Sequence, residues 1–227
     1  LISTIEKDEI NAEDCTDLVS ELEDEASIRC VQNLLSYLKL TQKRSFSHLQ
    51  KAQAYQSEFY LSMNYETKRN LELTTTIRSN QKHGSLFWFL DETQTAMGGR
   101  LLKQWLEKPL VLEGAIQKRH ALVETLNQHY FERTDFIETL KRVYDLERIV
   151  GKVSFGTANA RDLLQLKQTL GQVPIFKSIV DSLDSEEWSA LGENLFDIPE
   201  LYDLIDRAID EVAPLTISEG NIIRSGY

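Results

Sequence analysis

Residues 95–109 read TAMGGRLLKQWLEKP, and this stretch decides the fold class. Its apolar residues recur every three or four positions, which is the period of one helix face. They are Met97, Leu101, Leu102, Trp105 and Leu106. Thr93 or Thr95 suits the N-cap and Pro109 ends the pattern, so we predict an amphipathic helix. Gly98 and Gly99 weaken such a helix, and we interpret them as a place of close packing against another backbone.

Further stripes of the same period follow toward the C-terminus. They are Ile116, Val123, Leu126 and Tyr130, then Phe136, Leu140 and Val143, then Leu163, Leu166 and Leu170. Asn159 and Asp162 predict the beginning of the helix that carries the last of these stripes, and it ends near Gly171 and Pro174. The chain has only 10 Gly and 4 Pro to interrupt helices. The sequence therefore predicts a mainly all-α fold, a helical bundle.

A last helix is predicted over residues 197–213. Asp197 with Glu200 three residues later resembles a capping box, and Pro214 ends the helix. The predicted face consists of Leu201, Leu204, Ile205, Ala208 and Val212. At a rise of about 1.5 Å per residue, such a helix would be a rigid rod of roughly 25 Å.

The N-terminal part differs from the rest of the chain. Residues 21–40 predict a first helix, with Ile28, Val31, Leu35 and Leu38 on one face. Residues 46–78 are of mixed character and contain the β-branched run Thr74–Ile77. We therefore expect a few short extended segments near residues 46–78.

Composition and charge exclude several classes of protein. With 227 residues, 41% of them hydrophobic and 27% charged, the chain has the composition of a globular protein. No apolar run reaches the roughly 20 residues of a membrane helix, and two distant cysteines without a signal peptide favour a cytoplasmic protein. The net charge is -11, distributed as -9 over residues 1–25, +8 over residues 26–180 and -10 over residues 181–227. This balance argues against a chain that binds nucleic acid by itself.

A search for motifs of catalysis finds none. The sequence contains no phosphate-binding loop, no G-x-S-x-G elbow and no H-E-x-x-H or C-x-x-C pair. The four histidines are separated from one another and from the cysteines. We therefore predict no catalytic, cofactor-binding or metal-binding residue in this chain, and no enzymatic activity.

Five blocks of sequence, in order, resemble the core domain of the MutS family of DNA mismatch repair proteins. They are MNYETKRNLEL at 63–73, GSLFWFLDETQTAMGGRLLKQWL at 84–106, DLERI at 145–149, ARDL at 160–163 and GNIIRSGY at 220–227. The resemblance implies that residues 46–227 are a core domain, truncated where the chain enters the clamp. Residues 1–45 would be an acidic segment and connecting helix at the end of the connector region.

The resemblance also implies a function for the whole parent protein. Members of this family are dimeric ATPases that recognise mispaired DNA, so ATP and Mg would bind the parent outside this chain. The partners implied are the connector, clamp and ATPase domains of the same chain, mismatched duplex DNA and a second subunit, with no membrane. The core domain would couple the ATPase domain to the clamp mechanically. Two alternatives are a free-standing helical interaction module and a DNA-binding module that acts alone.

Some residues of the matching blocks have expected structural roles. We expect Trp88 and Trp105 to anchor the core. The arginines of these blocks are expected to tie helix ends together through carbonyl or carboxylate groups, with phosphate contacts as the alternative. These arginines are Arg69, Arg100, Arg148 and Arg161.

Overall fold

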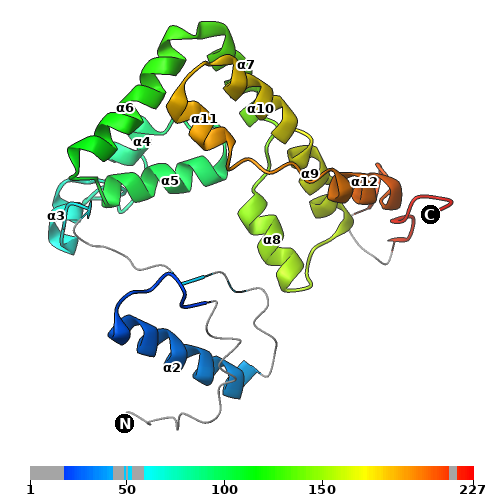
Figure 1. Ribbon diagram of the computed structural model, residues 1–227, viewed down its shortest axis with the longest axis horizontal. Helices are drawn as coiled ribbons and strands as arrows, with labels where there is room; N and C mark the ends of the chain where they lie inside the picture. Colours follow the sequence, from blue (N-terminus) through cyan, green and yellow to red (C-terminus); the bar gives the residue numbers. More distant parts are fainter. Residues whose placement is uncertain (1–17, 43–48, 50, 53–58, 215–218) are drawn as a thin grey trace. The chain divides into compact units, whose positions relative to one another are not determined.

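The computed structural model describes residues 18–42, 49, 51–52, 59–214 and 219–227 (Figure 1). The chain forms two compact units, Leu1–Ser57 and Glu58–Tyr227. Helices dominate the described residues, which confirms the predicted class. No sheet is present in these residues, and none of their helices is long and apolar enough to cross a membrane.

The first unit contains helix α2, Glu25–Gln42. The carboxylate of Asp24 accepts a hydrogen bond of 2.9 Å from the backbone N–H of Ser27, so the helix begins four residues later than predicted. The predicted face is the less exposed one, with Leu35 buried. The sequence pattern therefore identified the right face of α2.

The second unit begins with three helices, α3 (Tyr65–Asn70), α4 (Leu86–Leu90) and α5 (Ala96–Glu107). Thr95, one of the two predicted caps, accepts a hydrogen bond from the backbone N–H of Gly98. A Cβ atom on Gly98 would lie 3.1 Å from the Thr95 hydroxyl oxygen, and one on Gly99 would lie 3.3 Å from that of Thr93. The two glycines therefore pack against threonine side chains before their own helix, and the expected contact with another backbone was wrong.

Extended backbone is scarcer than predicted in the described part of residues 46–78. Tyr60 pairs with Leu110 in an isolated antiparallel bridge. The run Thr74–Ile77, expected to be extended, forms turns instead: the backbone N–H of Thr76 donates to the carbonyl of Gln81. Residues 46–48, 50 and 53–58 lie outside the described part of the chain.

Four helices pack together with Trp188, a residue of α11, between them: α6 (Glu113–Gln128), α7 (Tyr130–Leu140), α10 (Val173–Ser182) and α11 (Glu186–Gly192). Trp188 is buried with Val180 and Leu183. Its indole N–H donates to the carbonyl of Leu122 at 3.0 Å, and its ring lies edge-to-face with Phe136. The stripe predicted to run on to Tyr130 is divided, because α6 ends at Gln128.

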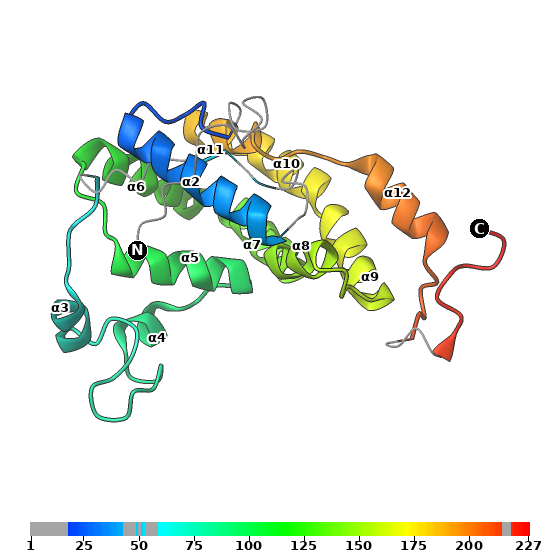
Figure 2. The ribbon, with the colours of Figure 1, turned by 90° about the horizontal axis from the view of Figure 1, so that it is seen from below.

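A second group consists of α8 (Leu146–Ser154), α9 (Ala160–Leu170) and α12 (Pro199–Ala208). Figures 1 and 2 both show α12 beside α9. Helix α12 ends five residues before the predicted position, because Ile209 is extended and pairs with Ile223. The predicted capping box was also wrong, since Ile198 is the N-cap and has no side-chain hydrogen bond.

Candidate functional site

The α9–α12 seam is the best-defined contact between helices distant in sequence. Its apolar part is a cluster of four buried residues, Ala160, Ile205, Ile209 and Ala213. Partly buried side chains from both helices surround it, among them Leu163, Leu166 and Leu201. Val212, which was predicted to belong to this face, is 89% exposed because it lies in the turn after α12. Truncating a buried Ile or Leu to Ala costs about 2–5 kcal/mol, so the cluster holds α12 firmly on α9.

Polar contacts cross the same seam. The ammonium of Lys167, 16% exposed, donates to a carboxylate oxygen of Asp206 at 2.9 Å. This hydrogen bond and the positive charge of Lys167 lower the pKa of Asp206, and Arg224 adds a weaker effect. The guanidinium of Arg161 donates to the carbonyl of Ala213 at 3.3 Å, so this arginine does tie α9 to a neighbouring segment.

Helix α9 begins where the sequence predicted, and a capping box fixes its first turn. Asn159 and Asp162 exchange hydrogen bonds between side chain and backbone, at 2.9 and 3.0 Å. Lys152 of α8 donates to the same Asp162 carboxylate at 2.6 Å. Burial raises the pKa of Asp162, but the hydrogen bonds from Lys152 and Asn159 and the charges of Lys152 and Arg148 outweigh this effect and lower it. This carboxylate therefore connects α8 to α9 in its ionised form.

Arg100 connects α5 to the beginning of α8. Its guanidinium holds both carboxylate oxygens of Asp145, at 2.9 and 2.7 Å, and also donates to Glu147. Asp145 is the N-cap of α8, so the same carboxylate caps this helix and accepts hydrogen bonds from Arg100. The hydrogen bonds to Asp145 and Glu147 raise the pKa of Arg100, and those from Arg100 lower the pKa of Asp145. Arg100 thus has the expected carboxylate partners.

The remaining arginines of the matching blocks have weaker contacts. Arg69 lies 4.0 Å from Glu66 of its own helix, at the limit of an ion pair. The backbone N–H of Arg148 donates to Asp145, and its side-chain charge contributes to the low pKa of Asp162.

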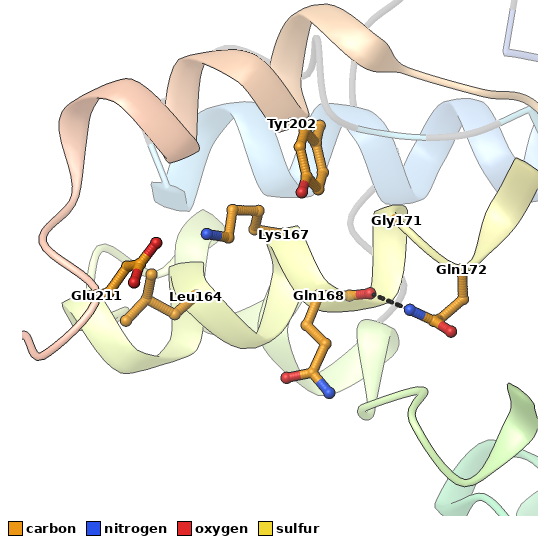
Figure 3. A pocket seen from close by; sticks show the side chains of 7 residues that line it. All are labelled: Leu164, Lys167, Gln168, Gly171, Gln172, Tyr202 and Glu211. Atoms are coloured by element: carbon orange, nitrogen blue, oxygen red, sulfur yellow. Dashed lines mark hydrogen bonds between the residues drawn. The ribbon is translucent and has the colours of Figure 1, made fainter.

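A cavity of about 390 Å³ opens beside the seam (Figure 3). Its lining residues come from α9, α12 and the segments that follow them: Leu164, Lys167, Gln168, Gly171, Gln172, Tyr202 and Glu211. A Cβ atom on Gly171 would lie 3.2 Å from the ring of Tyr202. The amide nitrogen of the buried Gln172 donates to the carbonyl of Gln168, and its Oε1 has no partner. The cavity has polar walls but no constellation of nucleophile and base.

The described residues contain no group of three or more His, Cys, Asp or Glu side chains that could hold a metal ion. The prominent feature of the site is the set of contacts that join α8, α9 and α12. The apolar cluster and the Lys167–Asp206 ion pair connect α9 to α12, and the Lys152–Asp162 ion pair connects α8 to α9. Packed interfaces of this kind move between discrete arrangements. These contacts hold the three helices together as one packed group.

Two tryptophans do not have their expected role. Trp88 is 45% exposed and packs against His83 with the two rings tilted by 45°. Trp105 is 40% exposed and lies under the guanidinium of Arg119. The buried tryptophan is Trp188. Sequence reasoning missed it, although Ser185 three residues earlier is an N-cap and Leu183 is apolar, so a helix beginning there was a readable signal.

Comparisons with known proteins agree on one family. The family model described as MutS domain III matches residues 66–225. The DNA mismatch repair protein MutS of Bacillus licheniformis is 48% identical over 225 residues, which are 99% of this chain and 26% of that protein. The protein of the same name from Bacillus subtilis is 46% identical over 99% of this chain and 26% of that protein. The one from Streptococcus mutans is 51% identical over 86% of this chain and 23% of that protein. The chain spans about a quarter of the length of these relatives.

Proposed function

Because the chain belongs to the MutS family, as its domain III, we propose that it couples the ATPase domain of a mismatch repair protein to the clamp that holds DNA. The observation that carries this proposal is the α9–α12 seam. It joins residues 39 positions apart, Lys167 and Asp206, and buries an apolar cluster next to them. A displacement of α9 therefore moves α12 as well, because neither the packing nor the ion pair stretches smoothly.

The rest of the proposal concerns the whole protein. The relatives are named DNA mismatch repair proteins and are about four times as long as this chain. We propose that the longer protein binds ATP and Mg in another domain, acts on mismatched DNA and forms a homodimer in the cytoplasm. Residues 46–227 would be its core domain, and residues 1–45 the end of its connector region.

The test is to loosen the seam in the full-length protein. Ile205 of α12 is buried in the cluster, whereas its neighbour Leu204 is 45% exposed. Ile205→Val costs about 0.5–1.5 kcal/mol and Ile205→Ala about 2–5 kcal/mol, and the milder variant retains the fold. We expect both to keep basal ATP hydrolysis while the change that mismatched DNA provokes decreases, more for alanine than for valine.

Leu204→Ala is the matched control, since it shortens an exposed side chain of the same helix. It should leave both the basal rate and the response to mismatched DNA as they are. If folded Ile205→Ala protein responds to mismatched DNA like the unmodified protein, α12 is a passive scaffold and the proposed coupling is wrong.

A further inference from the structure

The Glu58–Tyr227 unit contains two groups of helices, and helix packs on helix mainly within each of them. The Trp188 group consists of α6, α7, α10 and α11, and the seam group consists of α8, α9 and α12. Three chain segments connect the two groups: residues 141–145, 171–172 and 193–198. The angle between the groups therefore depends on these segments and on a few side-chain contacts.

All three segments enter the seam group at the same end. They lead to the beginning of α8, follow the end of α9 and lead to the beginning of α12. The backbone N–H of Tyr144, before α8, donates to the hydroxyl oxygen of Thr169, near the end of α9, at 3.0 Å. The ring of Tyr202, in the first turns of α12, lies against Gly171 (Figure 3). The seam group is therefore an arm that is attached to the Trp188 group at one end.

Residues 171–172 interrupt the helical hydrogen bonds between α9 and α10. Pro174, in the first turn of α10, has no N–H, so it cannot donate to the carbonyl of Leu170. The N–H of Gln172 donates to the carbonyl of Thr169 at 3.0 Å, which is the tighter bond of a 3₁₀ turn. Prolines are common places for a helix to bend, and a 3₁₀ turn inside a helix often marks a hinge. This segment therefore has the backbone features of a hinge.

Open space borders this segment. A cavity of about 390 Å³ is lined by Gly171 and Gln172 themselves, and a second cavity of about 360 Å³ is lined by Tyr144. Close-packed interiors resist small displacements, whereas unfilled space does not. The angle between the two groups can therefore change without steric overlap on the cavity side.

Arg100 links the attached end of the arm to the rest of the unit. Its guanidinium, in α5, holds Asp145 and Glu147 at the beginning of α8. Helix α5 is itself tied to the Trp188 group, since the guanidinium of Arg119 in α6 lies 3.6 Å from the centre of the Trp105 ring in α5. The side chains of Arg100 and Glu147 are 49% and 69% exposed, so this contact can open without uncovering the core.

We propose that the seam group swings as one rigid arm about residues 171–172 and that Arg100 is the latch that holds its angle. With the latch closed, the hydrogen bonds to Asp145 and Glu147 fix the beginning of α8 relative to α5. With the latch open, the arm has a range of angles, while the apolar cluster and two ion pairs keep α8, α9 and α12 together. The latch rests on the proposed coupling function, because a displacement that α9 and α12 share becomes a change of this angle.

Spin labels on the 227-residue chain measure the angle as a distance. Cys15 and Cys30 are first replaced by serine, and labels are attached through Ser154→Cys, at the far end of α8, and Ser189→Cys of α11. Both serines are exposed. Double electron–electron resonance should give a narrow distance distribution for the unmodified latch. Arg100→Gln should broaden this distribution or add a second maximum, because the latch cannot close.

Lys103→Gln is the matched control. Lys103 lies in the same helix as Arg100 and is 50% exposed, but its ion pair with Glu107 stays within α5. The change removes one positive charge and should leave the distribution as it is. A second control is the label pair Ser154→Cys and Asp203→Cys, which lies entirely in the arm and should stay narrow with Arg100→Gln.

Asp145→Asn tests the latch from the other side, should Arg100→Gln lower the helix content in circular dichroism. Asparagine is as good an N-cap as aspartate, so α8 keeps its cap while Arg100 loses a charged partner. It should broaden the distribution less than Arg100→Gln does, since Glu147 remains.

Four results overturn the proposal. They are an unchanged distance between the two groups in the folded latch variants, a broad distribution with the latch intact, an equal effect of Lys103→Gln, and a broadened distance within the arm. The coupling between α9 and α12 is tested independently by the ATPase response of the Ile205 variants. A failed latch would therefore leave the proposed function standing.

Discussion

Asp162 illustrates what one buried carboxylate does in this domain. It is 6% exposed, caps α9 and receives Lys152 from α8. Its folded-state pKa is lowered below the unfolded value of about 3.9, so it contributes stability above that pH and loses the contribution as the pH falls through the folded pKa. Asp162→Asn removes the ionised partner of Lys152. We expect it to lower the free energy of unfolding at pH 7 by about 1–3 kcal/mol, measured by urea denaturation.

The free energy of unfolding of the Asp162→Asn variant should also fall less steeply as the pH is lowered. Between about pH 5 and pH 2 the unmodified chain loses the Asp162 contribution, whereas Asp162→Asn has none to lose. Asp203→Asn, on the exposed face of α12, is the control and should follow the unmodified chain at every pH. Equal losses for the unmodified chain and Asp162→Asn on acidification would contradict the role given to this carboxylate.

Residue types alone do not say which side chain is buried. Trp88 and Trp105 were expected to anchor the core, but the buried tryptophan is Trp188, which the sequence analysis did not single out. It is enclosed in part by Leu122 and Phe136, which lie 66 and 52 positions away in the sequence. The burial of a large side chain depends on which helices pack together. One sequence, read locally, does not contain that information.

At the scale of the helix, the capping rules predicted the beginnings of α5 and α9 correctly but not that of α12. Thr95 was one of two predicted caps of α5, and Asn159 with Asp162 was the predicted beginning of α9; all three make cap hydrogen bonds. The pair Asp197 and Glu200 has the same spacing, but the helix begins at Pro199, whose ring favours the first turn. The end of α12 was predicted too late because Ile209 pairs with Ile223, and local sequence patterns do not predict a contact between residues so far apart.

Helix α6 lacks a side-chain cap, and a substitution should supply one. Its N-cap Leu112 is extended, 47% exposed and has no side-chain hydrogen bond to the first turn. Leu112→Asp places a carboxylate oxygen where it accepts from the backbone N–H of Gly114 or Ala115, with a favourable helix dipole. We expect a gain of about 0.5–1 kcal/mol, or roughly 2 °C in Tm.

Leu112→Ala is the matched control, since it loses the same leucine packing without gaining an acceptor. It should be neutral or slightly destabilising. A Tm for Leu112→Asp equal to that of Leu112→Ala would mean that the first turn of α6 does not use the new acceptor.

At the scale of the whole chain, charge is segregated along the sequence. The first 25 residues carry -9 and the last 47 carry -10, on either side of a middle segment of +8. We expect the chain alone to bind duplex DNA weakly and to lose that binding as salt rises from about 50 to 200 mM, because phosphate contacts release counterions. Fluorescence anisotropy with matched and mismatched duplexes should give the same affinity for both. A clear preference for the mismatched duplex would contradict this prediction.

The bridge between Ile209 and Ile223 determines how the C-terminal segment responds to a pulling force. Its flanking hydrogen bonds, from Arg224 to Ala208 and from Asp210 to Ile222, run across the two antiparallel segments. A force along the segments loads both bonds at once in shear, whereas a force at right angles peels them apart one after the other. The junction is therefore stiff under tension along its own length and gives way easily to a sideways pull, so it passes on force in one direction and yields in the other.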